Sequence, residues 1–198
     1  MTTTSRQAAL PVADRLWPAA AGAAGVARLV ALAIFGTCLL WASAKVQVPF
    51  WPVPMTLQTG VVLALGVAYG WRLAAATVVL YLAQGAVGLP VFAGTPERGL
   101  GLAYMLGPTG GYLLGFVAGA TIAGLATERA RGVIGLGLGL VLAMAAIYAC
   151  GVLWLAGFVG PGRVLAVGVV PFLLGDALKT ALVLVLALVA MRTARPGA

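Results

Sequence analysis

Long apolar runs alternate along the chain with short segments that hold most of its charged residues and prolines. A membrane-spanning helix needs about 20 mainly apolar residues. The runs predict six transmembrane helices, at about residues 22–44, 55–70, 73–89, 104–127, 133–157 and 166–190. The second and third are short, and Gly70-Trp71-Arg72 between them predicts a tight turn. We expect one membrane domain over residues 1–198, with residues 1–21 as a cytoplasmic tail.

Two connecting segments differ from ordinary aqueous loops. Residues 45–54, KVQVPFWPVP, contain three prolines and few polar residues. Proline removes a backbone donor and restricts the residue before it, so this stretch is not regular helix. We expect it to fold over the protein at the membrane interface, where Phe50 and Trp51 would be stable. Residues 90–103 form a second loop rich in proline and glycine.

Composition supports an all-α integral membrane protein. Hydrophobic residues make up 63% of the 198 residues and charged residues only 8%, against about 25% charged residues in soluble domains. The net charge of +8 comes from scattered basic residues without a basic face, so no nucleic acid is expected as a partner. Eight arginines fall on the side of the chain termini and three basic residues on the other. This asymmetry places both termini in the cytoplasm and the protein in the cytoplasmic membrane.

The residue inventory argues against an enzyme, a metal site and a bound cofactor. The chain has no histidine, and Cys38 and Cys150 lie far apart in apolar runs. No paired carboxylates, and no serine or cysteine beside a plausible base, are visible.

Two charges lie inside the last apolar run. Asp176 and Lys179 are three residues apart and share one helix face. If a regular helix begins near residue 166, Asp176 is about ten residues, or roughly 15 Å, inside it. Intramembrane charges are costly and usually functional. The pair is therefore a candidate ligand site, with a structural ion pair between helices as the alternative.

Other polar groups accompany this pair. Thr56, Gln58 and Thr59 lie at the outer end of the second span, and Gln84 lies in the third. They serve either to bind a small neutral-to-anionic ligand or to form interhelical hydrogen bonds. The segment GPTGGY at 107–112 predicts a helix N-terminus, whose free N–H groups could hold a carboxylate or a carbonyl.

Small residues recur every fourth position on two spans. One stripe comprises Gly107, Gly111, Gly115 and Gly119, for which we expect packing inside the chain. The other comprises Ala19, Ala23, Ala27 and Ala31 in the first span, and it fits internal packing and a partner membrane protein equally well.

Four segments in chain order resemble one family. They are QVPFWPVPMTLQT at 47–59, GLPVFAG at 88–94, LGPTGGYLLGF at 106–116 and GDALKTAL at 175–182. Together they resemble BioY, the biotin-binding S-components of energy-coupling factor (ECF) transporters. The resemblance implies a six-helix S-component bundle with an outward ligand site under the two loops. It also implies a membrane T-component and two ABC ATPases as partners, which the alanine face on the first helix would meet.

The resemblance also implies site residues. Asp176 and Lys179 match the acidic and basic positions of the family's last helix, with Asp176 accepting N–H groups from the ureido ring of biotin. Lys179 would contact the ligand or balance Asp176. Further candidates are Gln58, Arg98 as a partner of the biotin carboxylate, and the backbone around Gly110, Gly111 and Tyr112. For Arg98, a surface ion pair with Glu97 is the alternative.

Other functions are compatible with part of this pattern. An S-component for a different vitamin would share the bundle, and a membrane scaffold would use the charged pair for structure alone. The sequence also leaves open whether an ECF module is required or the chain acts alone or as an oligomer.

Overall fold

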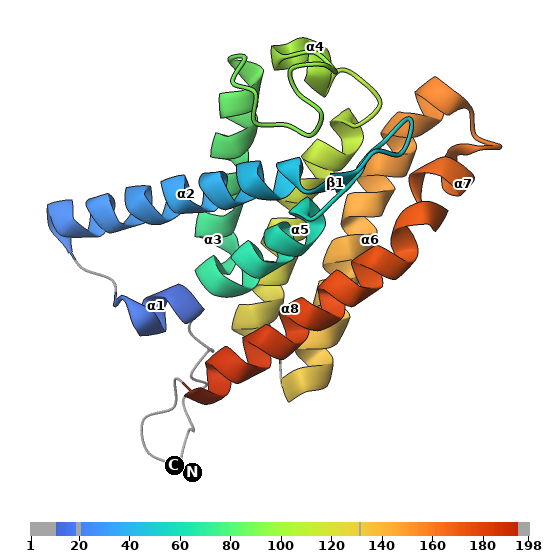
Figure 1. The fold of residues 1–198 in the computed structure, drawn as a ribbon. Coiled ribbons are helices and arrows are strands. Elements are labelled where there is room, and N and C mark those ends of the chain that lie inside the picture. The colour runs from blue at the N-terminus through green and yellow to red at the C-terminus, as the bar shows by residue number, and fades with distance from the viewer. Residues whose placement is uncertain (1–10, 19–20, 131, 194–198) are drawn as a thin grey trace.

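The computed structural model describes residues 11–18, 21–130 and 132–193 and is mostly helical (Figure 1). In chain order the elements are α1 (Val12–Leu16), α2 (Gly22–Lys45), β1 (Gln47–Val48), β2 (Met55–Thr56), α3 (Gln58–Ala86), α4 (Gly101–Met105), α5 (Gly110–Arg129), α6 (Gly132–Val159), α7 (Val164–Gly168), the 3-10 helix η1 (Val170–Phe172) and α8 (Leu173–Thr193). The predicted all-α class is confirmed, apart from the two-residue strands. These pair antiparallel, with Gln47 opposite Thr56 and Val48 opposite Met55.

Five helical segments within the described residues are long and apolar enough to cross a bilayer. They are Gly22–Lys45, Gln58–Ala86, Gly110–Arg129, Gly132–Val159 and Val164–Met191. The difference from the six predicted spans is that the second and third lie within the one element α3.

Gly70 interrupts α3 and folds it back on itself. Its φ of 72° and ψ of 170° are not helical, and a positive φ favours glycine. Gln58 Nε2 donates to the Tyr81 hydroxyl at 2.8 Å, although 23 residues of straight helix would separate the two by about 35 Å. The halves of α3 on either side of Gly70 therefore lie together, as the predicted turn at residues 70–72 requires. Glu128 Oε1 accepts the N–H of Trp71 at 3.2 Å, at the start of the second half.

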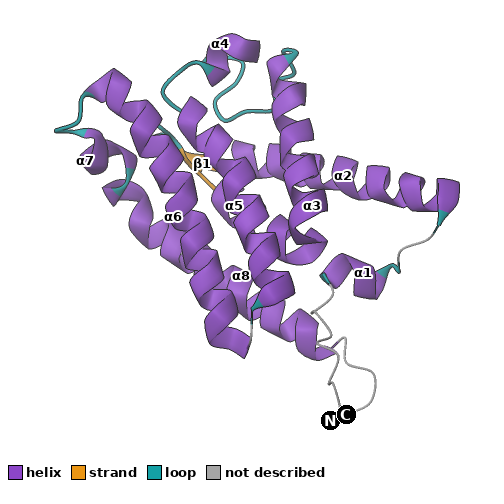
Figure 2. Ribbon diagram, turned by 180° about the vertical axis from the view of Figure 1, so that it is seen from behind, coloured by secondary structure: helices purple, strands orange, loops and turns teal. Residues whose placement is uncertain are grey.

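The core of the bundle is built around α5, which packs against α3 and α6 (Figure 2). The glycine stripe faces α6. A Cβ on Gly111 would lie 2.3 Å from the Trp154 Cβ, and one on Gly115 would lie 2.9 Å from the Ile147 Cα. A Cβ on Gly119 would lie 2.8 Å from the Ile147 side chain. Internal packing is confirmed for Gly111, Gly115 and Gly119, whereas Gly107 lies in the turn before α5.

Two predicted spans begin differently in the structure. The fourth was expected from residue 104, but α4 ends at Met105 and α5 begins only at Gly110. The sixth was expected as a regular helix from residue 166, but α7 and η1 precede α8, with Pro171 inside η1. Proline lacks the N–H that a continuing helix needs. Asp176 consequently lies in the first turn of α8 and not ten residues into a regular helix.

The N-terminal helices lie at one end and one side of the bundle (Figure 1). Residues 11–18 of the predicted tail include α1, and Arg28 Nη2 on α2 donates to Asp14 Oδ1 at 2.8 Å and to the Ala13 carbonyl at 3.0 Å. Arg28 is therefore buried in an ion pair. By contrast, Ala23, Ala27 and Ala31 are exposed on α2, while Ala19 lies outside the described residues.

Candidate functional site

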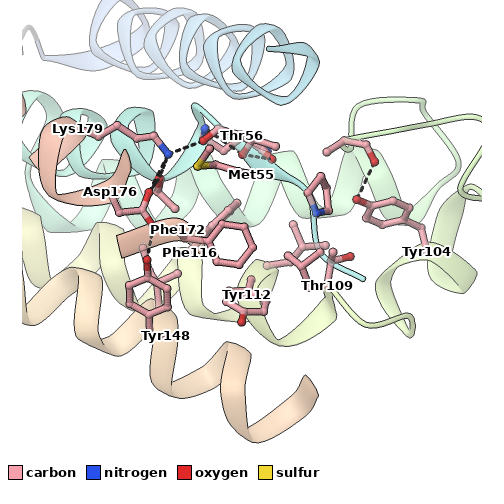
Figure 3. A pocket seen from close by; sticks show the side chains of 17 residues that line it. Met55, Thr56, Tyr104, Thr109, Tyr112, Phe116, Tyr148, Phe172, Asp176 and Lys179 are labelled. Carbon is pink, nitrogen blue, oxygen red and sulfur yellow. Dashed lines mark hydrogen bonds and ion pairs between the residues drawn. The ribbon is translucent and has the colours of Figure 1, made fainter. Parts of the chain in front are cut away.

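One cavity gathers most of the polar groups of the apolar bundle (Figure 3). It holds about 550 Å³ of empty space, counting the part open to solvent. The β1–β2 hairpin and the starts of α3 and α8 contribute to its wall, together with α5, α6 and η1. Its polar lining residues are Thr56, Gln58, Thr59, Tyr104, Thr109, Tyr112, Tyr148, Asp176 and Lys179, and its apolar ones are Val53, Pro54, Met55, Ala93, Leu113, Phe116, Ile147 and Phe172.

Asp176 is the centre of a hydrogen-bond cluster from three helices. Its Oδ1 accepts from the Thr59 hydroxyl at 2.7 Å and from Lys179 Nζ at 2.7 Å. Its Oδ2 accepts from the Tyr148 hydroxyl at 2.5 Å. Asp176 is only 4% exposed. A buried carboxylate needs such compensation, and the partial positive charge at the N-terminus of α8 adds to it.

Lys179 is enclosed by acceptors of the protein itself. Besides Asp176, its Nζ donates to the Thr56 carbonyl at 2.6 Å and to the Thr59 hydroxyl at 3.2 Å. A lysine ammonium has three N–H groups, so these three acceptors can use them all. The cation is held between α8 and the start of α3.

Gln58 links the cavity to the loop of residues 90–103 through Tyr81. Its amide nitrogen donates to the Tyr81 hydroxyl, which donates in turn to the Val91 carbonyl at 2.8 Å. Its Oε1 accepts from the Thr56 hydroxyl at a long 3.3 Å. The amide oxygen is thus the less engaged end of Gln58.

Aromatic side chains form much of the remaining wall. Phe116 and Phe172 line the cavity close to Asp176 (Figure 3). Phe92, in the loop of residues 90–103, stacks on Tyr104 with a centroid distance of 4.9 Å. The Tyr104 hydroxyl donates to the Ala93 carbonyl at 2.8 Å, and burial raises its pKa, so it stays a donor at neutral pH.

The two proline-containing loops are tied to each other and to α2. Arg98 donates to the carbonyls of Pro52 and Phe50, both at 3.3 Å. Lys45, at the end of α2, donates to the carbonyls of Phe92 and Thr95 at 3.2 and 3.3 Å. The predicted placement of residues 45–54 over the protein is confirmed, because Val53 and Pro54 line the cavity.

The structure separates the predicted site residues into two groups. Thr56, Gln58, Tyr112, Asp176 and Lys179 line the same cavity. The others do not: Gln84 donates to the Thr37 hydroxyl on α2 at 3.3 Å, Gly110 and Gly111 pack against Trp154 of α6, and Arg98 is exposed on the loop. Arg98 and Glu97 form no ion pair with each other among the described residues.

Sequence reasoning missed three aromatic residues of the cavity, besides several aliphatic ones. Tyr148, Phe116 and Phe172 lie in apolar runs, where an aromatic side chain is unremarkable. Tyr148 carried one usable signal, because it is the one residue with an aromatic hydroxyl between residues 133 and 157. A tyrosine hydroxyl buried in a membrane helix needs a hydrogen-bond partner. The charged pair Asp176 and Lys179 in the last span was the candidate partner.

Comparison with known proteins identifies the family. Residues 12–196 match the BioY family. The chain belongs to the BioY family. It is 37% identical over 161 residues to the probable biotin transporter BioY of Pyrococcus horikoshii, which covers 81% of this chain and 94% of that protein. It is 38% identical over 174 residues to the biotin transporter BioY of Thermotoga maritima, with 83% and 94% covered.

A solved structure has the same fold. The crystal structure of the S-component for biotin from an ECF-type ABC transporter matches with a TM-score of 0.74. The match covers 90% of this chain and 96% of that one, at 23% sequence identity. The resemblance to BioY is confirmed by the family match, and the chain is a multi-pass membrane protein with an S-component fold.

Proposed function

We propose that this BioY chain binds biotin in the cavity around Asp176 and delivers it across the cell membrane as the S-component of an ECF transporter. The observation that carries the proposal is the Asp176–Lys179 pair, buried in a cavity of a largely apolar bundle, beneath two loops. A costly buried charge pair in a pocket is expected where a polar ligand must be recognised.

The chemistry of biotin fits the groups of the cavity. Its ureido ring carries two N–H donors, for which Asp176 Oδ2 and Gln58 Oε1 are the available acceptors. Its sulfur-containing ring is apolar and would pack against Phe116 and Phe172. Lys179 already has three acceptors, so we assign it as the counter-ion of Asp176 and not as the main ligand contact.

The carboxylate of biotin needs a cation or several donors when it is covered. Arg98 is our candidate, because it lies on the loop above the cavity and, within the described part of the chain, donates only to two backbone carbonyls, Pro52 O and Phe50 O. Its exposed guanidinium retains further N–H groups for a carboxylate at the mouth.

Transport requires an energy source, for which we propose a T-component and two ABC ATPases. The exposed face of α2 that contains Ala23, Ala27 and Ala31 is the proposed contact for the T-component, since small side chains allow helices to approach closely in lipid. We further propose that the two halves of α3 cross the membrane separately, making six spans. An even number of spans and the arginine excess on the side of the termini then give cytoplasmic N- and C-termini.

The test is binding of biotin to the purified protein in detergent, measured by calorimetry. Nanomolar, one-to-one binding of biotin, with no heat from riboflavin or thiamine at the same concentrations, is expected. Binding of another vitamin but not biotin would replace the ligand and keep the S-component function. A folded protein that binds none of them would overturn the proposal.

A further inference from the structure

Tyr148 lies where the cavity adjoins a second space. Both spaces are lined by Tyr148 and Asp176. The second is an open groove between α6 and α8, with about 1,010 Å³ of empty space including its open part. Its other lining residues are Gly137, Val141, Met144, Ala145, Leu173, Ala177, Thr180, Ala181 and Leu184.

Apart from Tyr148, the lining of the groove offers the Asp176 carboxylate no polar partner. Among its lining residues, Thr180 has a hydroxyl, but this donates at 2.7 Å to the backbone carbonyl of Asp176 and not to the carboxylate. A carboxylate facing hydrocarbon without a donor is costly. The Tyr148 hydroxyl supplies that donor to Oδ2, and the Tyr148 ring stands between α6 and the carboxylate (Figure 3).

Counting acceptor positions shows what Tyr148 leaves for a ligand. A carboxylate has about four lone-pair positions. Thr59 and Lys179 occupy both positions of Oδ1, and Tyr148 occupies one of Oδ2. One position of Oδ2 therefore remains, enough for a single N–H of a neutral ligand.

We propose that Tyr148 is a positioning and specificity-determining residue of the site. It orients Asp176 so that the carboxylate presents one free acceptor position toward the cavity, and it closes the site against the groove between α6 and α8. This inference rests on the proposed biotin function. It explains how a site with a full negative charge would select a neutral ureido group over a cationic one, because Lys179 and the two hydroxyls already compensate the carboxylate.

The test combines two variants with three ligands. Tyr148→Phe keeps the ring and removes the hydroxyl. Tyr69→Phe is the matched control, since the Tyr69 hydroxyl donates to the Leu32 carbonyl at 2.9 Å, and Tyr69 does not line the cavity. The ligands are biotin, desthiobiotin, which keeps the ureido ring and lacks the sulfur, and 2-iminobiotin, whose ring is a cationic guanidinium at neutral pH.

In Tyr148→Phe the dissociation constants of biotin and desthiobiotin should rise together by about tenfold, the usual effect of losing a hydrogen bond to a charged group. The constant for 2-iminobiotin should rise less or fall, because a cation compensates the uncovered Oδ2. A change in the shape of the cavity alone would weaken the binding of all three ligands equally. Tyr69→Phe should bind all three as the wild type does.

Each outcome decides the inference. Unchanged biotin binding in Tyr148→Phe, or a biotin-to-iminobiotin affinity ratio equal to that of the wild type, overturns it and leaves the biotin function standing. A wild type that binds no biotin overturns both. If Tyr148→Phe has a lowered melting temperature, it is compared with the wild type through the biotin-to-iminobiotin affinity ratio. A partly unfolded sample does not alter this ratio.

Discussion

Replacing Asp176 by asparagine removes one charge from the cavity while keeping the size of the side chain. Asparagine can still accept from Thr59 through its amide oxygen, but its NH₂ group replaces the acceptor Oδ2 that would meet a ureido N–H. A hydrogen bond to a charged group contributes about 1.5–3 kcal/mol. The dissociation constant for biotin should therefore rise about 10- to 150-fold.

The same substitution also leaves Lys179 without its counter-ion. The Lys179 side chain is 13% exposed, so it remains a largely buried charge. Breaking a buried ion pair typically costs about 3–5 kcal/mol of stability. Lys179 keeps the Thr56 carbonyl and the Thr59 hydroxyl as acceptors, so we expect the lower end of that range, seen as a reduced melting temperature in detergent.

A double-mutant cycle separates these two effects. Asp176→Asn combined with Lys179→Met removes both charges, so stability should largely return while biotin binding stays weak. Calorimetry gives the affinity and thermal unfolding gives the stability of each of the four proteins. Wild-type affinity in Asp176→Asn would refute the ligand contact. Recovery of full affinity in the double variant would show that Asp176 acts only by neutralising Lys179.

Three further predictions concern packing, the loops and the partner face. Gly111→Ala should destabilise the bundle by about 1–3 kcal/mol, because its Cβ would lie 2.3 Å from the Trp154 Cβ. Gly157→Ala is the control, because a Cβ there would have no described neighbour within 4 Å; equal melting temperatures of the two variants would contradict the packing argument. Arg98→Ala should speed dissociation of biotin several-fold in a radioligand chase by loosening the two loops, and an unchanged rate would exclude a closing role for Arg98. Ala27→Trp should leave biotin binding by the isolated protein intact but abolish ATP-driven uptake in cells that contain the ECF module, and normal uptake would remove this face of α2 from the proposed interface.

The hydroxyls around Asp176 illustrate where prediction from sequence stopped. Thr59 was visible as a polar residue in an apolar run, yet nothing in the sequence brings it to Asp176, 117 residues further along. Tyr148 reaches the same carboxylate from a third helix. Gln84 has a similar sequence context to Gln58, but it turns to Thr37 on α2 and stays outside the cavity. Each case depends on the rotation of a helix about its own axis.

The sequence by itself determined the membrane class, the positions of the apolar runs and the turn at Gly70. It also determined the charged pair and, through four motifs, the family. These features are local, and in an apolar chain each charge, proline or glycine stands out. Only the tertiary structure decided which side chains share the cavity, where α8 begins and that Tyr148 contacts Asp176. The physical reason is that lipid-facing and core-facing surfaces are both apolar, so hydrophobic periodicity does not reveal which face of a membrane helix points inward.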